Sequence, residues 1–354
     1  MSKSISKPFI SVIIPAYNSA KFIRKCLNSA ISQTFKDIEI ICIDDCSEDN
    51  TAEILQEYAN RDARIKIITN QTKQYAGISR NIGVEAAVGE YIFYLDSDDY
   101  LQENALETVY KASQKNPGID VIITQLNFIN YYTGLQLKIP PIPNSYTNRI
   151  MNIQTDPDCI KFMNYAVIAI LIRRKMLIDN SILFKNYKSL EDVEYAHNLY
   201  IYAKNIIFLP DKVYNYRYNR RGSVASKKYT NLNVLIDALE NIERHKEEIP
   251  EEVYKRFRII LFRSIGECTN DGYSLSKISY NEFKYIYEDI IDHSLFSEPE
   301  MKYCKAKYER FKRCTPLKFK IISIIIYLIK NQFPTYYTTI LKIQQKLRLK
   351  RNAI

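Results

Sequence analysis

The sequence predicts an α/β protein built on a mostly parallel β-sheet. Three observations lead to this fold class: short β-branched apolar runs recur early in the chain, amphipathic helical segments separate them, and polar residues follow three of the runs. Strands that alternate with helices form βαβ units, and their right-handed crossovers make neighbouring strands parallel.

Four runs have the length and composition of buried strands: residues 10–14 (ISVII), 38–43 (IEIICI), 65–68 (IKII) and 91–95 (YIFYL). Helical segments lie between them, at residues 20–33, 51–59 and 79–87. The first carries one apolar stripe at helical spacing, made by Phe22, Ile23, Cys26, Leu27, Ala30 and Ile31. Ser47 or Asp49 is placed to cap the second.

Beyond residue 101 the pattern is weaker. We expect a helix near 103–115, a strand at 120–124, an irregular loop at 138–148, an ordered segment at 166–177, a helix at 191–205, a strand and turn at 206–223, and helices over 231–315. The chain therefore continues the α/β pattern and then becomes helical.

Polar residues follow three of the predicted strands: Tyr17 and Asn18, then Asp44 and Asp45, then Asp96 and Asp98. In a parallel sheet the carboxyl ends of the strands share one edge, which is where ligands bind in open α/β folds. We therefore expect these side chains to converge in space.

Composition bounds the class of protein. The chain has 354 residues, of which 46% are hydrophobic and 25% charged, which is typical of a folded soluble protein. Its seven cysteines contain no Cys-x-x-Cys pair, so we expect reduced thiols in a cytoplasmic protein rather than a zinc or redox site. The first residues do not resemble a secretory signal.

Positive charge is concentrated at the end of the chain. The net charge is +10, and residues 316–354 carry eight basic residues and no acidic one. The apolar run at 319–330 is too short to span a membrane, so we expect a helix lying on an anionic membrane surface, with packing on protein as the alternative. We expect no nucleic-acid partner, because the sequence has no nucleic-acid-binding motif.

Several segments in order resemble the family 2 glycosyltransferases. They are SVIIPAYNSAKFIRKCLNSAISQTFKDIEIICIDDCSEDNTAEI, GISRNIGVEAAVGEYIFYLDSDDYL and, more weakly, LIRRKMLIDNSILF, LEDVEYA and VYNYRYNRRGSV, which extend to about residue 225. Two positions depart from the family pattern: Cys46 stands where Gly is common, and no Trp precedes Arg173 and Arg174.

The resemblance implies a GT-A fold, which is Rossmann-like, a nucleotide-sugar donor and inversion at the anomeric carbon. We accordingly expect a GT-A domain at 1–225, a helical extension at 226–315 and a basic amphipathic tail at 316–354. Within the domain, residues 1–101 form the nucleotide-binding half and 102–225 the acceptor half.

Asp96-Ser97-Asp98 matches the D-x-D motif of the family. Because carboxylate and phosphate oxygens suit Mn²⁺ or Mg²⁺, the resemblance assigns Asp98 to a metal that stabilises the leaving diphosphate, and Asp96 to the donor ribose or the metal. Asp99 supports either. A solvated acidic turn after an edge strand is the alternative.

The resemblance also places the end of the first strand, with Pro15, Tyr17 and Asn18, around the nucleobase. Tyr17 is suited to stack on uracil, and Asp44 to accept its imide N–H, which favours a UDP donor. A core aromatic is the alternative for Tyr17. For Asp44 and Asp45 the alternative is helix capping.

Further site residues follow from the same match. Arg80 corresponds to an arginine near the donor diphosphate or base, or is a solvated charge. In Glu191-Asp192, Asp192 is the expected general base and Glu191 orients the acceptor or Asp192, although acidic residues also favour helix starts. Tyr216 and Arg217 begin a loop that is suited to closing over the diphosphate; the alternative is a merely solvated basic loop.

The sequence thus predicts an inverting transferase that moves a hexose or N-acetylhexosamine from a UDP-sugar. The expected acceptor is a saccharide or lipid-linked saccharide, in envelope polysaccharide or lipooligosaccharide synthesis at the cytoplasmic membrane face. The alternatives are a sugar nucleotidyltransferase, which would need a Gly-rich loop after the first strand, and a non-catalytic module that binds nucleotide-sugar or glycan.

Overall fold

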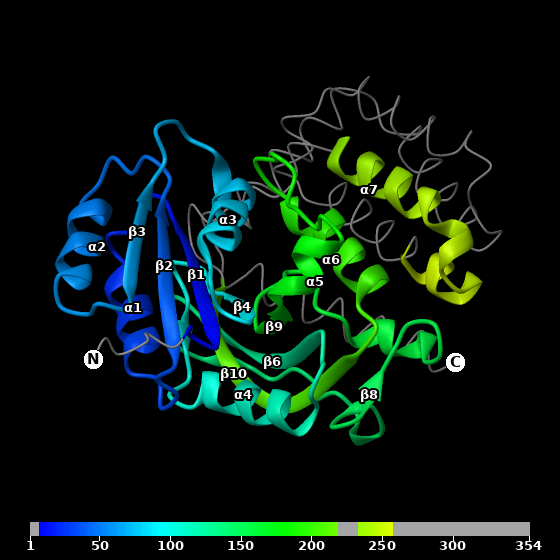
Figure 1. The fold of residues 1–354 in the computed structure, drawn as a ribbon. Coiled ribbons are helices and arrows are strands. Elements are labelled where there is room, and N and C mark those ends of the chain that lie inside the picture. Colours follow the sequence, from blue (N-terminus) through cyan, green and yellow to red (C-terminus); the bar gives the residue numbers. More distant parts are fainter. Residues whose placement is uncertain (1–6, 219–232, 258–354) are drawn as a thin grey trace, which may run out of the picture. The chain divides into compact units, whose positions relative to one another are not determined.

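The computed structural model describes residues 7–218 and 233–257 (Figure 1). The expected tail at 316–354 and most of the expected helical extension lie outside these residues. Contacts between residues divide the chain into two compact units, and the first of them, Met1–Tyr218 with Asn233–Arg256, contains nearly all of the described structure.

The described strands form one ten-stranded sheet of order β3-β2-β1-β4-β9-β6-β10-β5, with β7 beside β6 and β8 beside β10. Its first half is parallel and consists of β1 (Ile10–Ala16), β2 (Ile38–Asp44), β3 (Ile65–Thr69) and β4 (Tyr91–Tyr94). All four lie where the sequence predicts strands. Every residue of β1 and β2 is buried, as expected for strands covered on both faces.

Helices cover both faces of this half-sheet. They are α1 (Ile23–Ile31), α2 (Thr51–Ala59) and α3 (Tyr75–Ala86). Ile10, Val12 and Ile14 pack in one core with the buried residues of α1 and α2. Ile13 points to the opposite face, against α3. Gly83 of α3 leaves room for this side chain, because a Cβ at residue 83 would lie only 2.4 Å from Ile13 Cγ2. Figure 1 shows α3 between this half-sheet and α6.

The second half of the sheet is mixed. It contains β5 (Tyr100–Leu101), β6 (Val121–Asn130), β7 (Gln136–Leu137), β8 (Ile150–Met151), β9 (Ile170–Arg173) and β10 (Ile206–Tyr218). β9 runs antiparallel to both β4 and β6, and so joins the two halves. The helices of this half are α4 (Ala105–Lys115), α5 (Arg174–Asp179), α6 (Glu191–Tyr202) and α7 (Asn233–Arg244).

Short 3₁₀ helices complete the described part at Asn144–Tyr146, Pro157–Phe162 and Lys246–Glu248. The first lies inside the segment at 138–148 that the sequence predicts as an irregular loop. Within the predicted strand and turn at 206–223, residues 206–218 form one long strand, β10, whose register with β6 shifts between Phe208 and Lys212, and the remaining residues lie outside the described part. Pro210 lies in this irregularity, because proline has no amide hydrogen for a regular ladder.

The predicted α/β fold with a large sheet flanked by helices is confirmed. α7 lies within residues 231–315, where the sequence predicts helices, and its Asn241 donates to Asn198 of α6 at 2.7 Å. The predicted boundary at residue 225 falls outside the described residues.

A buried carboxylate fastens the amino edge of the sheet. Glu39 on β2 accepts hydrogen bonds at Oε1 from Ser11 Oγ (2.6 Å), Val88 N (2.8 Å) and Gly89 N (3.2 Å), and at Oε2 from Lys66 Nζ (2.8 Å). Burial opposes ionisation of this carboxyl, but the donors outweigh it and lower the pKa of Glu39. Glu39 therefore ties β1, β3 and the turn before β4 to β2.

Replacing Glu39 by Ala is expected to lower the free energy of unfolding by about 2–3 kcal/mol, because the buried donors at Val88 and Ser11 lose their acceptor. Glu39→Gln keeps a carbonyl oxygen and should lose about half as much. Chemical denaturation measures both variants. Wild-type stability in the Ala variant would contradict this role of Glu39.

Candidate active site

Polar segments from three parallel strands meet at the carboxyl edge of the sheet, as the sequence predicts. Backbone pairing sets Ala16 beside Asp44 and Ile13 beside Tyr94, so the segments that follow β1, β2 and β4 leave the sheet at one edge. Ser19 Oγ and Ser97 Oγ lie 2.7 Å apart, which joins the loop after β1 to the acidic turn after β4.

The acidic turn gathers three carboxylates. Asp96, Asp98 and Asp99 each offer an oxygen, and the three oxygens lie within 4.8 Å of one another. Asp96 and Asp98 are partly exposed, whereas Asp99 is 1% exposed. Hard oxygen ligands at this spacing suit Mg²⁺ or Mn²⁺. The residues present therefore fit the predicted metal, with Asp96 and Asp98 as the accessible ligands.

Asp99 anchors the acidic turn to β10. Its Oδ2 accepts from the Tyr214 hydroxyl at 3.0 Å, and its Oδ1 accepts from the Arg217 backbone N–H at 2.8 Å. The same hydroxyl accepts from the Asp96 N–H at 3.0 Å. Burial, and then the charges of Asp98 and Asp96, raise the pKa of Asp99 well above its ordinary value. A bound cation would relieve this crowding of negative charge.

The loop after β1 is fixed to the loop after β2 by hydrogen bonds between backbone N–H groups and side-chain oxygens. Asn18 has a left-handed backbone (φ +46°), donates its N–H to Ser47 Oγ at 3.0 Å and accepts from Glu48 N at 2.8 Å. Pro15 is buried within β1. Tyr17 is 38% exposed, and Lys73 Nζ lies 3.0 Å from the centroid of its ring. The ring is therefore at the surface and not in the core.

Asp44 and Asp45 take different roles. Asp45 accepts from Gln74 N (2.7 Å) and Tyr75 N (2.8 Å), so it caps α3 from another part of the chain. Asp44 is 2% exposed, and its Oδ1 has no hydrogen-bond partner among the described residues. Because a buried unsatisfied acceptor is unfavourable, this oxygen is suited to an N–H of a ligand.

Cys46, which departs from the family pattern, directly follows these two acids. Its backbone is left-handed (φ +60°), a conformation that glycine adopts without strain. The Cys46 thiol donates to the Asn70 carbonyl at 3.0 Å, which gives the side chain a partner in this position.

Arg80 lies between two carboxylates rather than on a solvated helix face. Its Nη2 donates to Asp96 Oδ1 at 2.8 Å and its Nη1 to Glu191 Oε1 at 3.0 Å, and its side chain is 6% exposed. Burial alone would lower the pKa of Arg80, but the two acids outweigh it and raise it. The structure thus brings together the D-x-D segment and the Glu-Asp pair through one guanidinium.

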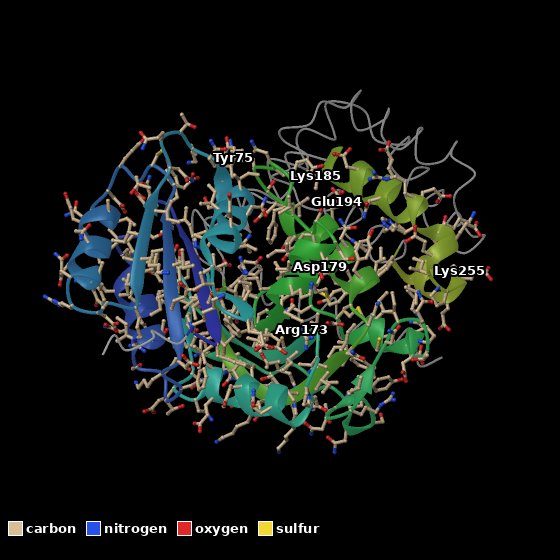
Figure 2. All side chains as sticks on the ribbon, in the orientation of Figure 1. Tyr75, Arg173, Asp179, Lys185, Glu194 and Lys255 are labelled. Carbon is tan, nitrogen blue, oxygen red and sulfur yellow. The ribbon has the colours of Figure 1, made fainter. Side chains whose placement is uncertain are left out.

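The Glu-Asp pair begins α6, as the sequence predicts. Leu190, the residue before it, has a left-handed backbone (φ +63°), so the chain turns sharply into the helix and sets the direction of its first turn. Glu191 and Asp192 are partly exposed. In Figure 2, Lys185 and Glu194 lie beside each other, and their 2.8 Å ion pair holds the preceding segment to α6.

Tyr216 and Arg217 lie beside the acidic turn near the end of β10, so they belong to a strand paired with β6 and not to the predicted loop. The Tyr216 ring packs edge-on against Phe128, with centroids 5.4 Å apart. The Arg217 guanidinium lies 5.1 Å from the centroid of the Tyr100 ring. Its Nη2 is buried without a hydrogen-bond partner among the described residues, which makes it a candidate donor to an anion.

The sequence did not point to Tyr214, which holds both ends of the acidic turn, nor to Lys73 beside Tyr17. Both contacts join segments far apart in the chain, and 29 tyrosines give no local reason to single out one. No motif could have identified Lys73.

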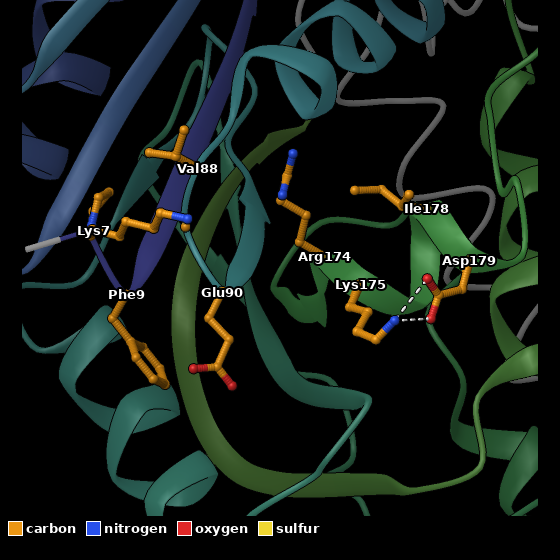
Figure 3. A pocket seen from close by; sticks show the side chains of 10 residues that line it. Lys7, Phe9, Val88, Glu90, Arg174, Lys175, Ile178 and Asp179 are labelled. Atoms are coloured by element: carbon orange, nitrogen blue, oxygen red, sulfur yellow. Dashed lines mark hydrogen bonds and ion pairs between the residues drawn. The ribbon is translucent and has the colours of Figure 1, made fainter.

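An open cavity of about 470 Å³ lies elsewhere, near the amino ends of β1 and β4. Figure 3 shows Phe9, Val88 and Glu90 on one side and Arg174 to Asp179 of α5 on the other, with the Lys175–Asp179 ion pair of 2.6 Å. It contains none of the predicted site residues. The candidate active site is therefore the carboxyl edge and not this cavity.

Known proteins resemble this chain in sequence and in fold. The sequence profile described as Glycosyl transferase family 2 matches residues 11–179. The chain is 33% identical over 231 residues to glycosyltransferase GlyG of Streptococcus pneumoniae serotype 4, which covers 62% of this chain and 74% of GlyG. The chain belongs to the family 2 glycosyltransferases. This confirms the family resemblance, and the chain is accordingly an enzyme that transfers sugars.

Two further similarities concern other glycosyltransferases of this kind. Over 241 residues the chain is 32% identical to a poly(ribitol-phosphate) β-glucosyltransferase of Bacillus spizizenii, covering 66% of this chain and only 36% of that protein. The crystal structure of Staphylococcus aureus TarS residues 1–349 in complex with UDP-GlcNAc has a TM-score of 0.61 at 22% identity, covering 85% and 91% of the two chains. This structural similarity confirms the GT-A fold.

Within residues 7–218 and 233–257, no helix combines the length and apolar character that crossing a membrane requires. The predicted membrane contact rests on the tail at 316–354, which lies outside these residues.

Proposed function

We propose that this family 2 enzyme transfers a hexose or N-acetylhexosamine from a UDP-sugar, with inversion, to a saccharide or lipid-linked acceptor of the cell envelope. The observation that carries the proposal is the convergence of two acidic segments, 96–99 and 191–192, on one buried arginine. One segment suits a metal-bound diphosphate, and the other suits a hydroxyl that must lose a proton.

A UDP donor is supported by Asp44 and Tyr17. The buried Oδ1 of Asp44 needs a donor, and the imide N–H of uracil supplies one, whereas cytosine presents an acceptor at that position. Tyr17 offers an exposed ring for stacking. The UDP-GlcNAc complex of the structurally similar TarS agrees with this choice.

Two accessible carboxylates fit a divalent metal. Asp98 and Asp96 would hold Mn²⁺ or Mg²⁺, which when bound neutralises charge on the departing diphosphate. The chain itself contributes Arg217, whose Nη2 has no partner among residues 7–218 and 233–257 and is suited to a phosphate oxygen, and Asp99, which holds the turn in place.

Asp192 is the proposed general base. In an inverting transfer the acceptor hydroxyl attacks the anomeric carbon from the face opposite the leaving diphosphate, and Asp192 takes the hydroxyl proton as the bond forms. Glu191 is held by Arg80 at 3.0 Å, so it fixes the start of the helix that carries the base. A sugar nucleotidyltransferase or a non-catalytic module gives no role to this pair.

The acceptor class is inferred from related enzymes. The B. spizizenii relative is named for poly(ribitol-phosphate), and an envelope polymer of this type is the acceptor we propose. We retain attachment at an anionic membrane surface through the tail at 316–354, with the active site facing the cytoplasm, as part of the proposal.

Titration calorimetry with UDP, GDP and CDP in the presence of Mn²⁺ tests the donor. We expect UDP to bind at least about tenfold more tightly than the other two, because cytosine lacks the N3–H donor and guanine presents its N1–H from a larger, bicyclic ring. Asp44→Asn should reduce this preference while Asp37→Asn, an acid before β2 and away from the site, should not. Equal binding of GDP and UDP would contradict the proposal.

A further inference from the structure

One face of α3 is in contact with the acceptor half at every turn. Gly77, Arg80, Asn81 and Val84 are spaced at helical intervals, so they share a side of the helix. Asn81 exchanges two hydrogen bonds with the backbone of Phe184, at 2.8 and 3.0 Å. The Val84 carbonyl accepts from Arg174 Nε at 3.4 Å.

Gly77 brings this face close to Glu191. A Cβ at residue 77 would lie 3.1 Å from Glu191 Cγ and 3.0 Å from Phe184 Cβ, so a larger residue here would require these side chains to shift by a few tenths of an ångström. The α3 backbone therefore packs directly against the first residue of α6, and small displacements of one are felt by the other.

The guanidinium of Arg80 is enclosed by aromatic rings. It lies 5.3 Å from the centroid of Phe184 and 5.9 Å from that of Tyr94. Phe184 stacks on Tyr195 of α6 at 3.7 Å, and the Tyr94 and Tyr195 hydroxyls are 3.0 Å apart. With the rings excluding water, the two ion pairs of Arg80 are strong and directional.

We infer that Arg80 is a positioning residue that couples donor occupancy at Asp96 to the base segment 190–195. The inference rests on the proposed function for the roles of Asp96 and Asp192. Arg80 forms a bridge of two ion pairs between Asp96 and Glu191. A ligand that moves Asp96, or changes the charge around it, changes the Arg80–Asp96 ion pair and therefore the position of Arg80 relative to Glu191. Donor binding is thereby transmitted to the helix turn that carries the base.

The bridge is broken by Arg80→Met, which keeps the length of the side chain without its charge. Turnover of UDP-GlcNAc, UDP-glucose and UDP-galactose with Mn²⁺ should fall about 30- to 100-fold in kcat, while the calorimetric Kd for UDP changes less than about threefold. Arg80→Lys should recover about a tenth to a third of wild-type turnover, because it keeps the charge but not the forked geometry.

Hydrogen exchange measures the coupling between donor binding and residues 190–195 without requiring turnover. Amides of residues 190–195 should exchange faster in Arg80→Met than in wild type, and addition of UDP with Mn²⁺ should change their rates only in wild type. Arg64→Met, which removes a partly buried arginine paired with Asp62 away from the site, is the control and should leave these amides unchanged.

A double-mutant cycle with Glu191→Gln separates the routes. If Arg80 acts through Glu191, the double variant should be no worse than the poorer single variant. Multiplicative losses would overturn the inference, as would a tenfold or greater rise in Kd for UDP with kcat retained. If no UDP-sugar is turned over, the proposed function fails, and wild-type exchange at 190–195 in ligand-free Arg80→Met would still overturn the coupling separately.

Discussion

Asp192→Asn is expected to lower kcat by at least about 10²-fold while leaving the Kd for UDP within about twofold of wild type. Asparagine has nearly the same shape as aspartate but cannot accept the proton of the attacking hydroxyl. UDP release measured at saturating donor gives kcat, and calorimetry gives the Kd. We expect a selective loss of kcat because, in the proposed function, the other acidic segment binds the donor.

A matched control is available on α5. Asp179 is exposed and pairs with Lys175 at 2.6 Å, away from the carboxyl edge, so Asp179→Asn should have wild-type kcat. Full activity in Asp192→Asn would place the base elsewhere. A loss in Kd as large as the loss in kcat would instead assign Asp192 to donor binding.

Asp98→Ala is expected to remove metal-dependent turnover, with a loss of about 10²- to 10³-fold that added Mn²⁺ does not restore. The physical reason is that the variant lacks one of the two accessible carboxylates that we propose as metal ligands in the acidic turn. Thermal denaturation provides a second measurement. Mn²⁺ with UDP should raise the Tm of wild type and have little effect on the variant, because only a bound native state is stabilised.

The ligand-free variant should be at least as stable as wild type. Asp98 is one of the charges that crowd Asp99, so its removal relieves repulsion in the folded state. Asp211→Ala, which changes an exposed acid on β10, serves as the control and should keep both turnover and metal response. Metal-dependent activity retained in Asp98→Ala would contradict the D-x-D assignment.

The sequence was most informative where the local pattern and the tertiary structure agree. β1, β2 and β4 are buried on both faces, so their apolar runs mark them directly, and α2 has the predicted bounds. α3 begins at Tyr75, before the predicted Ser79, because Asp45 caps it from thirty positions earlier in the chain. No pattern within the helix contains that information.

The same reason limits prediction of the site. The D-x-D segment and the Glu-Asp pair could be found from motifs, and their convergence on a common edge follows in part from parallel strands. The bridge through Arg80 could not, since Glu191 is 111 positions away from it. Nor could the anchoring of Asp99 by Tyr214, which depends on β10 lying beside β5.

The most direct test of a metal-dependent inverting UDP-sugar transferase is the configuration of the first-formed product. Proton NMR would follow UDP-α-GlcNAc, UDP-α-glucose and UDP-α-galactose with Mn²⁺, using ribitol phosphate oligomers or water as acceptor. We predict a β-configured product, UDP release, and loss of both when EDTA is added. An α-configured first product, or turnover undiminished by EDTA, would contradict the proposed mechanism.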